Sequence, residues 1–177
     1  MKIRWTWALL LVLLAVFSIN GLAQSKPATA NTADGPLAPV AWLTGGTWVT
    51  DIKDPSDGTV THVDNHIRWA PNHQAIEFNT DFNGRPHYNG FYAFNPVTKT
   101  IVFYYTSSEG ELTIGTATPD PDGKTLHHDF DLLHTDGRTG HIRSTVVPDG
   151  NDAYWFTVFM QKDGEWAQVF KIRYERK

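Results

Sequence analysis

The sequence contains no cysteine, which excludes disulfides, thiolate metal sites and cysteine nucleophiles. Positive charge is also scarce, since 15 Lys and Arg stand against 19 Asp and Glu and the formal net charge is −4. Basic clusters are absent from the sequence, and an acidic surface without them does not suit nucleic acids or anionic membranes. We therefore expect neither as a partner.

The one long apolar run lies at the N-terminus. Residues 8–17 are apolar, follow two basic residues and precede the small residues Gly21-Leu22-Ala23. These features are typical of a signal peptide, and a run of about ten residues is too short to span a bilayer comfortably, although an uncleaved anchor is the alternative. We expect residues 1–23 to be removed, so that the mature protein is periplasmic or secreted and has no membrane contact after cleavage.

Beyond the signal peptide, the sequence shows a regular series of turns and no helical periodicity of useful length. The turn signals are Asp57-Gly58, Pro71-Asn72, Asn83-Gly84, Asn95-Pro96, Glu109-Gly110, Asp122-Gly123, Asp136-Gly137, Asp149-Gly150 and Asp163-Gly164. Their spacing of roughly 11 to 15 residues predicts short antiparallel strands joined by hairpins. Nine such turns predict about ten strands, and this order favours an up-and-down barrel that leaves no strand edge exposed.

The expected strands have two kinds of pattern. They span residues 47–53, 59–69, 75–82, 86–94, 100–106, 112–118, 125–133, 140–147, 153–161 and 166–176. Several alternate, as in the last, where Phe170, Ile172 and Tyr174 share one face, which indicates one buried and one solvated side. The strands around Phe91, Tyr104 and Phe156 are apolar on both faces, so we expect the outer face to be covered by a homodimer partner or, less favoured, by the leader. The alternative is a protein-interaction module whose apolar face awaits a foreign partner.

The expected domain organisation follows from these segments. Residues 24–36 are small and polar, with prolines, and predict a flexible leader. Residues 37–177 then form one all-β domain of a size that can bury a core. Its first segment, residues 37–43, is apolar and predicts a short helix that plugs one end of the barrel.

At Leu43-Thr44-Gly45-Gly46-Thr47-Trp48, this apolar segment runs into a Gly-x-Trp motif on the first expected strand. The motif resembles the calycin superfamily of lipocalins, fatty-acid-binding proteins and their bacterial relatives. The resemblance implies that Trp48 closes one end of the barrel. It also implies that a basic residue of the last strand, Arg173 or Arg176, packs over that tryptophan.

Further motifs make the resemblance more specific. They are Arg68-Trp69, the segment Asn89-Gly90-Phe91-Tyr92-Ala93-Phe94-Asn95-Pro96 and the closing Arg173-Tyr174-Glu175-Arg176. Residues 37–177 thus resemble an uncharacterised bacterial family of exported calycin-like domains. The haem-binding ten-stranded relatives have a second glycine soon after the tryptophan and an axial histidine near the C-terminus. Val49-Thr50-Asp51 follows Trp48 and the final histidine is His141, so no haem or other cofactor is expected.

The strongest candidates for function are polar or aromatic residues on otherwise apolar strand faces. They are Asn65, Trp69, Thr80, Tyr92, Thr116, His128, Ser144, Gln168 and Tyr174. A cavity with a few such groups is the usual design of a ligand site. The alternative is that these groups satisfy one another or hold trapped water. We expect a barrel that binds a small apolar or amphipathic molecule, with no catalytic residue assigned.

Two other chemistries remain open. A barrel hydrolase or isomerase would use His128 with Tyr92, Ser144 or Tyr174 inside the lumen. A metal site would need three of His62, Asp64, His66, His127, Asp129 and His141 to converge. These six residues lie on the solvated faces of alternating strands, so no metal is expected.

Overall fold

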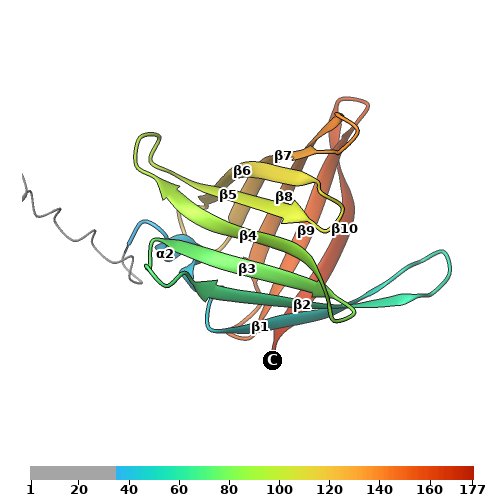
Figure 1. Cartoon of the computed structure of the whole chain (residues 1–177), viewed down its shortest axis with the longest axis horizontal. Coiled ribbons are helices and arrows are strands. Elements are labelled where there is room, and N and C mark those ends of the chain that lie inside the picture. Colours follow the sequence, from blue (N-terminus) through green and yellow to red (C-terminus); the bar gives the residue numbers. More distant parts are fainter. Residues whose placement is uncertain (1–34) are drawn as a thin grey trace, which may run out of the picture. The chain divides into compact units, whose positions relative to one another are not determined.

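A computed structural model describes residues 35–177 of the chain. The expected signal peptide and nearly all of the expected leader lie outside the described residues. The described part is an all-β domain in which ten antiparallel strands close into one barrel, as the turn spacing predicts (Figure 1). No helix within residues 35–177 is long and apolar enough to cross a membrane.

The strands follow one another around the barrel in sequence order. A one-turn helix, α2 (Ala38–Ala41), precedes β1 (Gly46–Lys53), β2 (Val60–Trp69), β3 (Ala75–Phe82), β4 (Arg85–Asn95), β5 (Thr100–Ser107), β6 (Leu112–Pro119), β7 (Leu126–Leu133), β8 (Thr139–Pro148), β9 (Ala153–Lys162) and β10 (Glu165–Arg176). Because consecutive strands are antiparallel neighbours, every second hairpin lies at the same end of the barrel.

The turns have the backbone geometry that their residues favour. The glycine of each of the seven predicted Asp-Gly, Glu-Gly and Asn-Gly turns has a positive φ, between 68° at Gly123 and 86° at Gly137. The two turns that contain proline use His73 (φ 54°) and Lys99 (φ 57°) instead. A positive φ is costly for most residues but free for glycine, so the glycines fix where each hairpin reverses.

The barrel closes where β1 meets β10. Trp48 pairs with Arg176, and Val49 with Glu175, across this seam. The Trp48 side chain is fully buried, and its indole N–H donates a hydrogen bond to the carbonyl of Leu43 at 2.7 Å. The guanidinium carbon of Arg176 lies 4.2 Å from the centre of the indole ring. This confirms the expected packing of a last-strand arginine over the tryptophan.

Arg176 also holds the segment between α2 and β1. Its two terminal nitrogens donate to the carbonyls of Thr44 at 3.0 Å and Trp42 at 3.1 Å. Arg173, the other candidate, forms ion pairs with Asp149 and Glu175 instead. The helix itself is shorter than expected, but Val40 is fully buried in the core.

The outer surface has one row of exposed apolar side chains. Phe91 (38% exposed), Tyr104 (38%) and Ile114 (48%) are direct neighbours across β4, β5 and β6. The rings of Phe91 and Tyr104 lie 5.3 Å apart. Phe156, which the sequence pattern linked with them, points into the barrel and packs against Phe170 from the inside. The outer aromatic row is therefore confined to one side of the barrel.

Replacing Arg176 with alanine should destabilise the barrel by about 2 kcal/mol, because one cation–π contact and two partly buried hydrogen bonds are lost together. Urea unfolding measures this change. The control is Arg173→Ala on the same strand, whose exposed ion pairs are screened by water, so that stability should change little. Equal losses in both variants would contradict the role given to Arg176.

Candidate functional site

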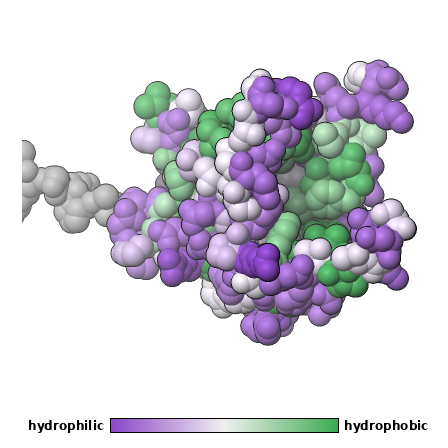
Figure 2. All heavy atoms as spheres, turned by 45° about the vertical axis from the view of Figure 1, so that its right-hand side comes forward, coloured by the Kyte–Doolittle hydropathy of each residue, from purple (hydrophilic) through white to green (hydrophobic). Residues whose placement is uncertain are grey.

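The barrel encloses a cavity of about 330 Å³. Its wall is mostly aromatic and aliphatic and includes inward-facing residues of β1–β5 and β7–β10, with Leu43 from the segment after α2. Phe170, which lines the cavity, is 44% exposed, so the cavity reaches solvent near the hairpin between β9 and β10. Figure 2 shows this side of the barrel hollowed and bordered by hydrophobic residues.

Tyrosine is the most frequent polar residue of the wall. Five of the six tyrosines in the sequence line the cavity: Tyr88, Tyr92, Tyr105, Tyr154 and Tyr174. Burial raises the pKa of Tyr88 to about 12 and raises the pKa of the other four as well. All five phenols are therefore neutral at physiological pH, and the hydroxyl groups of Tyr92 and Tyr154 are engaged by His128 and Asn65.

A hydrogen-bonded chain crosses from the cavity into the wall. The Tyr92 hydroxyl lies 3.0 Å from Nε2 of His128, and Nδ1 of His128 lies 3.1 Å from Oγ of Ser144. All three side chains are buried, and Ser144 lies on the far side of the imidazole from Tyr92, away from the cavity lining. Both ring nitrogens of His128 thus already have protein partners.

His128 is neutral in this setting. Burial and, to a smaller extent, the positive charge that neighbouring His127 can carry lower the pKa of His128 to about 3. A neutral imidazole has one donor and one acceptor nitrogen, and Tyr92 and Ser144 can each supply the complementary role. The chain is therefore satisfied internally, with a hydroxyl at its cavity end.

A second polar pair lies across the lumen on β2 and β3. The Thr80 hydroxyl donates to Oδ1 of Asn65 at 3.2 Å, and both residues line the cavity. Asn65 also contacts Tyr154, whose ring stacks on Tyr174 at 4.9 Å. The wall therefore holds two polar groups of residues, separated by aromatic surface.

Two glycines make room for the rings. A Cβ at Gly90 on β4 would overlap the Tyr104 carbonyl and the Tyr105 side chain. A Cβ at Gly115 on β6 would overlap the backbone and Cβ of Phe130. Since these positions lack side chains, Tyr105 and Phe130 can turn into the lumen and line it.

The structure brings five of the nine predicted site residues together on the cavity wall. Asn65, Thr80, Tyr92, His128 and Tyr174 all line it. Ser144, the cross-strand neighbour of His128 on β8, is its hydrogen-bond partner but does not itself line the cavity. These residues come from six different strands, so no local motif in the sequence reveals that they meet.

The other three predicted residues do not line the cavity. Trp69 packs against the core beside His73, at the end of the barrel where β2 ends. Thr116 pairs with Val102 and Asp129, and therefore faces outward, because the inward positions of β6 are Thr113, Gly115 and Ala117.

Gln168 is exposed because β10 has an irregularity. It lies opposite Phe159, whereas Phe170 lies opposite Val158, so the register shifts between the two residues. The simple alternation that places Gln168 on the inner face with Phe170 is thereby broken.

Sequence reasoning missed several wall residues. Tyr88, Tyr105 and Tyr154 belong to strands with aromatic residues on both faces, where alternation does not tell inside from outside. For Tyr105 the available signal was Gly90, which lies opposite it, because a glycine inside a strand often marks the close approach of a large neighbour.

The outer histidines form ion pairs. His62 contacts Asp51 at 2.7 Å and Asp64 at 3.5 Å, and His141 contacts Asp131 at 2.8 Å and Asp129 at 3.1 Å. Within residues 35–177, no group of three or more His, Asp or Glu side chains is arranged to hold a metal ion. These histidines are exposed members of a charged surface.

No protein-family model matches the sequence, and no curated protein matches it significantly. The site must be interpreted from its own geometry.

Because the pKa of His128 is lowered, the free energy of unfolding should fall as the pH falls. The ordinary pKa of a histidine is about 6.5, so the unfolded chain binds a proton at His128 below that pH. In the folded chain His128 stays neutral down to about pH 3, so acid stabilises the unfolded state relative to the folded one. Between pH 7 and pH 5 the protein should lose about 2 kcal/mol more unfolding free energy than a His128→Gln variant. Urea unfolding at both pH values measures this difference.

The matched control is His127→Gln, the next residue on β7, whose side chain pairs with Asp120 on the outer face. This variant should retain the acid dependence of the unchanged protein. If His128→Gln retains it as well, then His128 is not held neutral by burial.

Proposed function

We propose that the protein binds a small apolar or amphipathic molecule inside the barrel. The observation that carries this proposal is the cavity of about 330 Å³, whose wall is aromatic and aliphatic apart from a few hydroxyl, amide and imidazole groups. A concave, mostly apolar site with a few converging polar groups is the usual form of a small-molecule site. The apolar wall supplies affinity by removing ligand surface from water, and the hydroxyl groups orient the ligand.

A barrel enzyme that uses His128 is the second candidate. Tyr92, His128 and Ser144 are within hydrogen-bond reach, which is what that candidate requires. Ser144, however, is buried and does not line the cavity, which argues against its hydroxyl as a nucleophile. A histidine with a pKa of about 3 is also a weak base at neutral pH. These facts favour binding over acid–base or nucleophilic catalysis.

We also propose that the barrel is of the calycin type and is exported. Support for the type comes from Gly46-x-Trp48 on the first strand, and from Arg176 packed over that tryptophan. Leu43 lines the cavity and lies next to Trp42, whose ring meets Trp48 edge-on, so the α2 segment is well placed to close that end. Support for export comes from the signal-peptide pattern of residues 1–23 alone.

A homodimer through the outer aromatic row is a separate proposal. Phe91, Tyr104 and Ile114 form a contiguous apolar surface, and such surface favours burial against another chain. The leader in residues 24–36 is the alternative cover. Light scattering of the full mature chain distinguishes the two, since only the first gives a mass that doubles with concentration.

Filling the lumen should abolish binding. Val158 lines the cavity and is buried, so a Val158→Trp variant would occupy part of the space that a ligand needs. The neutral dye N-phenyl-1-naphthylamine is a suitable probe, because its fluorescence rises when it leaves water for an apolar site. We expect the folded variant to bind the dye at least about tenfold more weakly, a change of about 1.4 kcal/mol.

The matched control is Val169→Trp, a position that is 49% exposed and does not line the cavity. This variant should bind the dye as the unchanged protein does. If the unchanged protein does not bind the dye, or if both variants bind it equally, the lumen is not the binding site. Circular dichroism establishes that each variant is folded.

A further inference from the structure

We infer that the cavity accepts uncharged ligands and rejects carboxylates, including fatty acids. This inference rests on the proposed ligand binding and names the chemical class of the ligand. Three independent features carry it: the residues of the wall, the protonation of its titratable groups, and the charge of the hairpins at the open end.

The described side chains that line the cavity include no lysine, arginine, aspartate or glutamate. A carboxylate taken from water into an apolar site needs a cation or several hydrogen-bond donors to offset its lost hydration. Without a basic side chain in the wall, the cavity offers an anion no ion pair.

The titratable groups of the wall do not provide the missing positive charge. His128 is the one histidine among the lining residues, and its two nitrogens are engaged by Tyr92 and Ser144. Protonating it would place an uncompensated charge among the rings of Phe103 and Tyr92. The hydroxyl groups of Tyr92 and Tyr154 are already engaged by His128 and Asn65, so they are not free to donate to a carboxylate. The remaining phenols are neutral and can hydrogen-bond an alcohol, ether, ketone or amide of the ligand.

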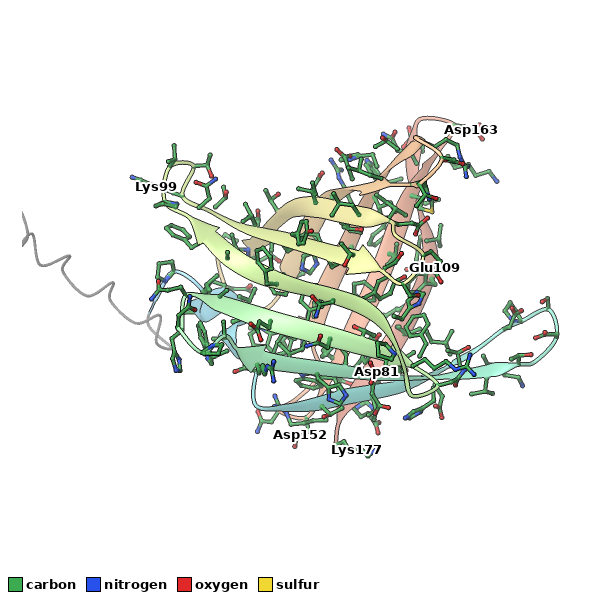
Figure 3. The ribbon with its side chains drawn as sticks, in the orientation of Figure 1. Asp81, Lys99, Glu109, Asp152, Asp163 and Lys177 are labelled. Carbon is green, nitrogen blue, oxygen red and sulfur yellow. The ribbon has the colours of Figure 1, made fainter. Side chains whose placement is uncertain are left out.

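The hairpins at the open end are acidic. They comprise residues 53–60, 82–85, 107–112, 133–139 and 162–165, which follow β1, β3, β5, β7 and β9. Together they carry seven carboxylates and four Lys or Arg, a formal charge of −3 with His134 neutral. Figure 3 shows Glu109 and Asp163 on hairpins at this end, and Lys99 at the opposite end of the barrel. An approaching anion therefore meets repulsion before it reaches the lumen.

The position of Phe170 allows a direct test. Its side chain lines the cavity and is partly exposed at the open end, so a charge placed there can face the lumen without being fully buried. Val169, its neighbour at the register shift, is 49% exposed and does not line the cavity. The pair allows the same positive charge to be added to the protein in two places, one inside the binding site and one outside.

The experiment compares two ligands of the same skeleton, 2-naphthalenemethanol and 2-naphthoate, at pH 7.5. Each competes with N-phenyl-1-naphthylamine for the full mature chain. We expect the alcohol to displace the dye at a concentration at least about tenfold lower than the carboxylate. Equal displacement by both ligands overturns the inference.

The variants then test the cause of the selectivity. Phe170→Arg should reduce the preference for the alcohol at least about threefold, whereas Val169→Arg should leave the preference unchanged. If both variants change the preference equally, the net charge of the protein and not the cavity wall determines the selectivity, and the inference fails. Failure of the dye itself to bind the unchanged protein would refute the proposed function instead, so the two failures are distinguishable.

Discussion

The contact between the first and the last strand is the one on which the remaining structure depends. A meander of ten strands that does not close has two free edges and no enclosed space. The seam is short, since the register joins Trp48 to Arg176 and Val49 to Glu175. Arg176 reinforces it by covering the indole ring and by holding the carbonyls of Trp42 and Thr44. The cavity exists because this seam holds.

The interior of the barrel is partly filled by large side chains and partly open as a cavity. Large rings such as Phe103 and Tyr105 extend into the lumen, and the missing side chains of Gly90 and Gly115 let them do so. The polar groups among the rings are mostly satisfied by one another, as Tyr92, His128 and Ser144 show. A wall that satisfies its own hydrogen bonds needs no ligand to be stable, so it can remain open for one.

The sequence predicted the strands well because turn chemistry is local. A glycine with positive φ marks a hairpin whatever lies elsewhere, and every expected strand end agrees with the structure to within one residue. The direction of side chains was harder to predict. Thr116 shares its face of β6 with the apolar Ile114, so the outer face was mistaken for the inner one. Gln168 precedes a register shift in β10, so it does not share the inner face with Phe170. The error at Thr116 arises from tertiary packing, since β6 keeps small residues inward where Phe130 lies against Gly115, and the error at Gln168 arises from the irregularity of β10.

The seam also determines when the barrel can form. Arg176 and Thr44, which it joins, are 132 positions apart along the chain. The hairpins between neighbouring strands involve short loops and can form early, whereas closure must wait until β10 has been synthesised. Until then the chain is a curved sheet with both edges free, which is the form most open to pairing with other chains. Folding speed and the risk of aggregation are therefore both governed by the last strand to be made.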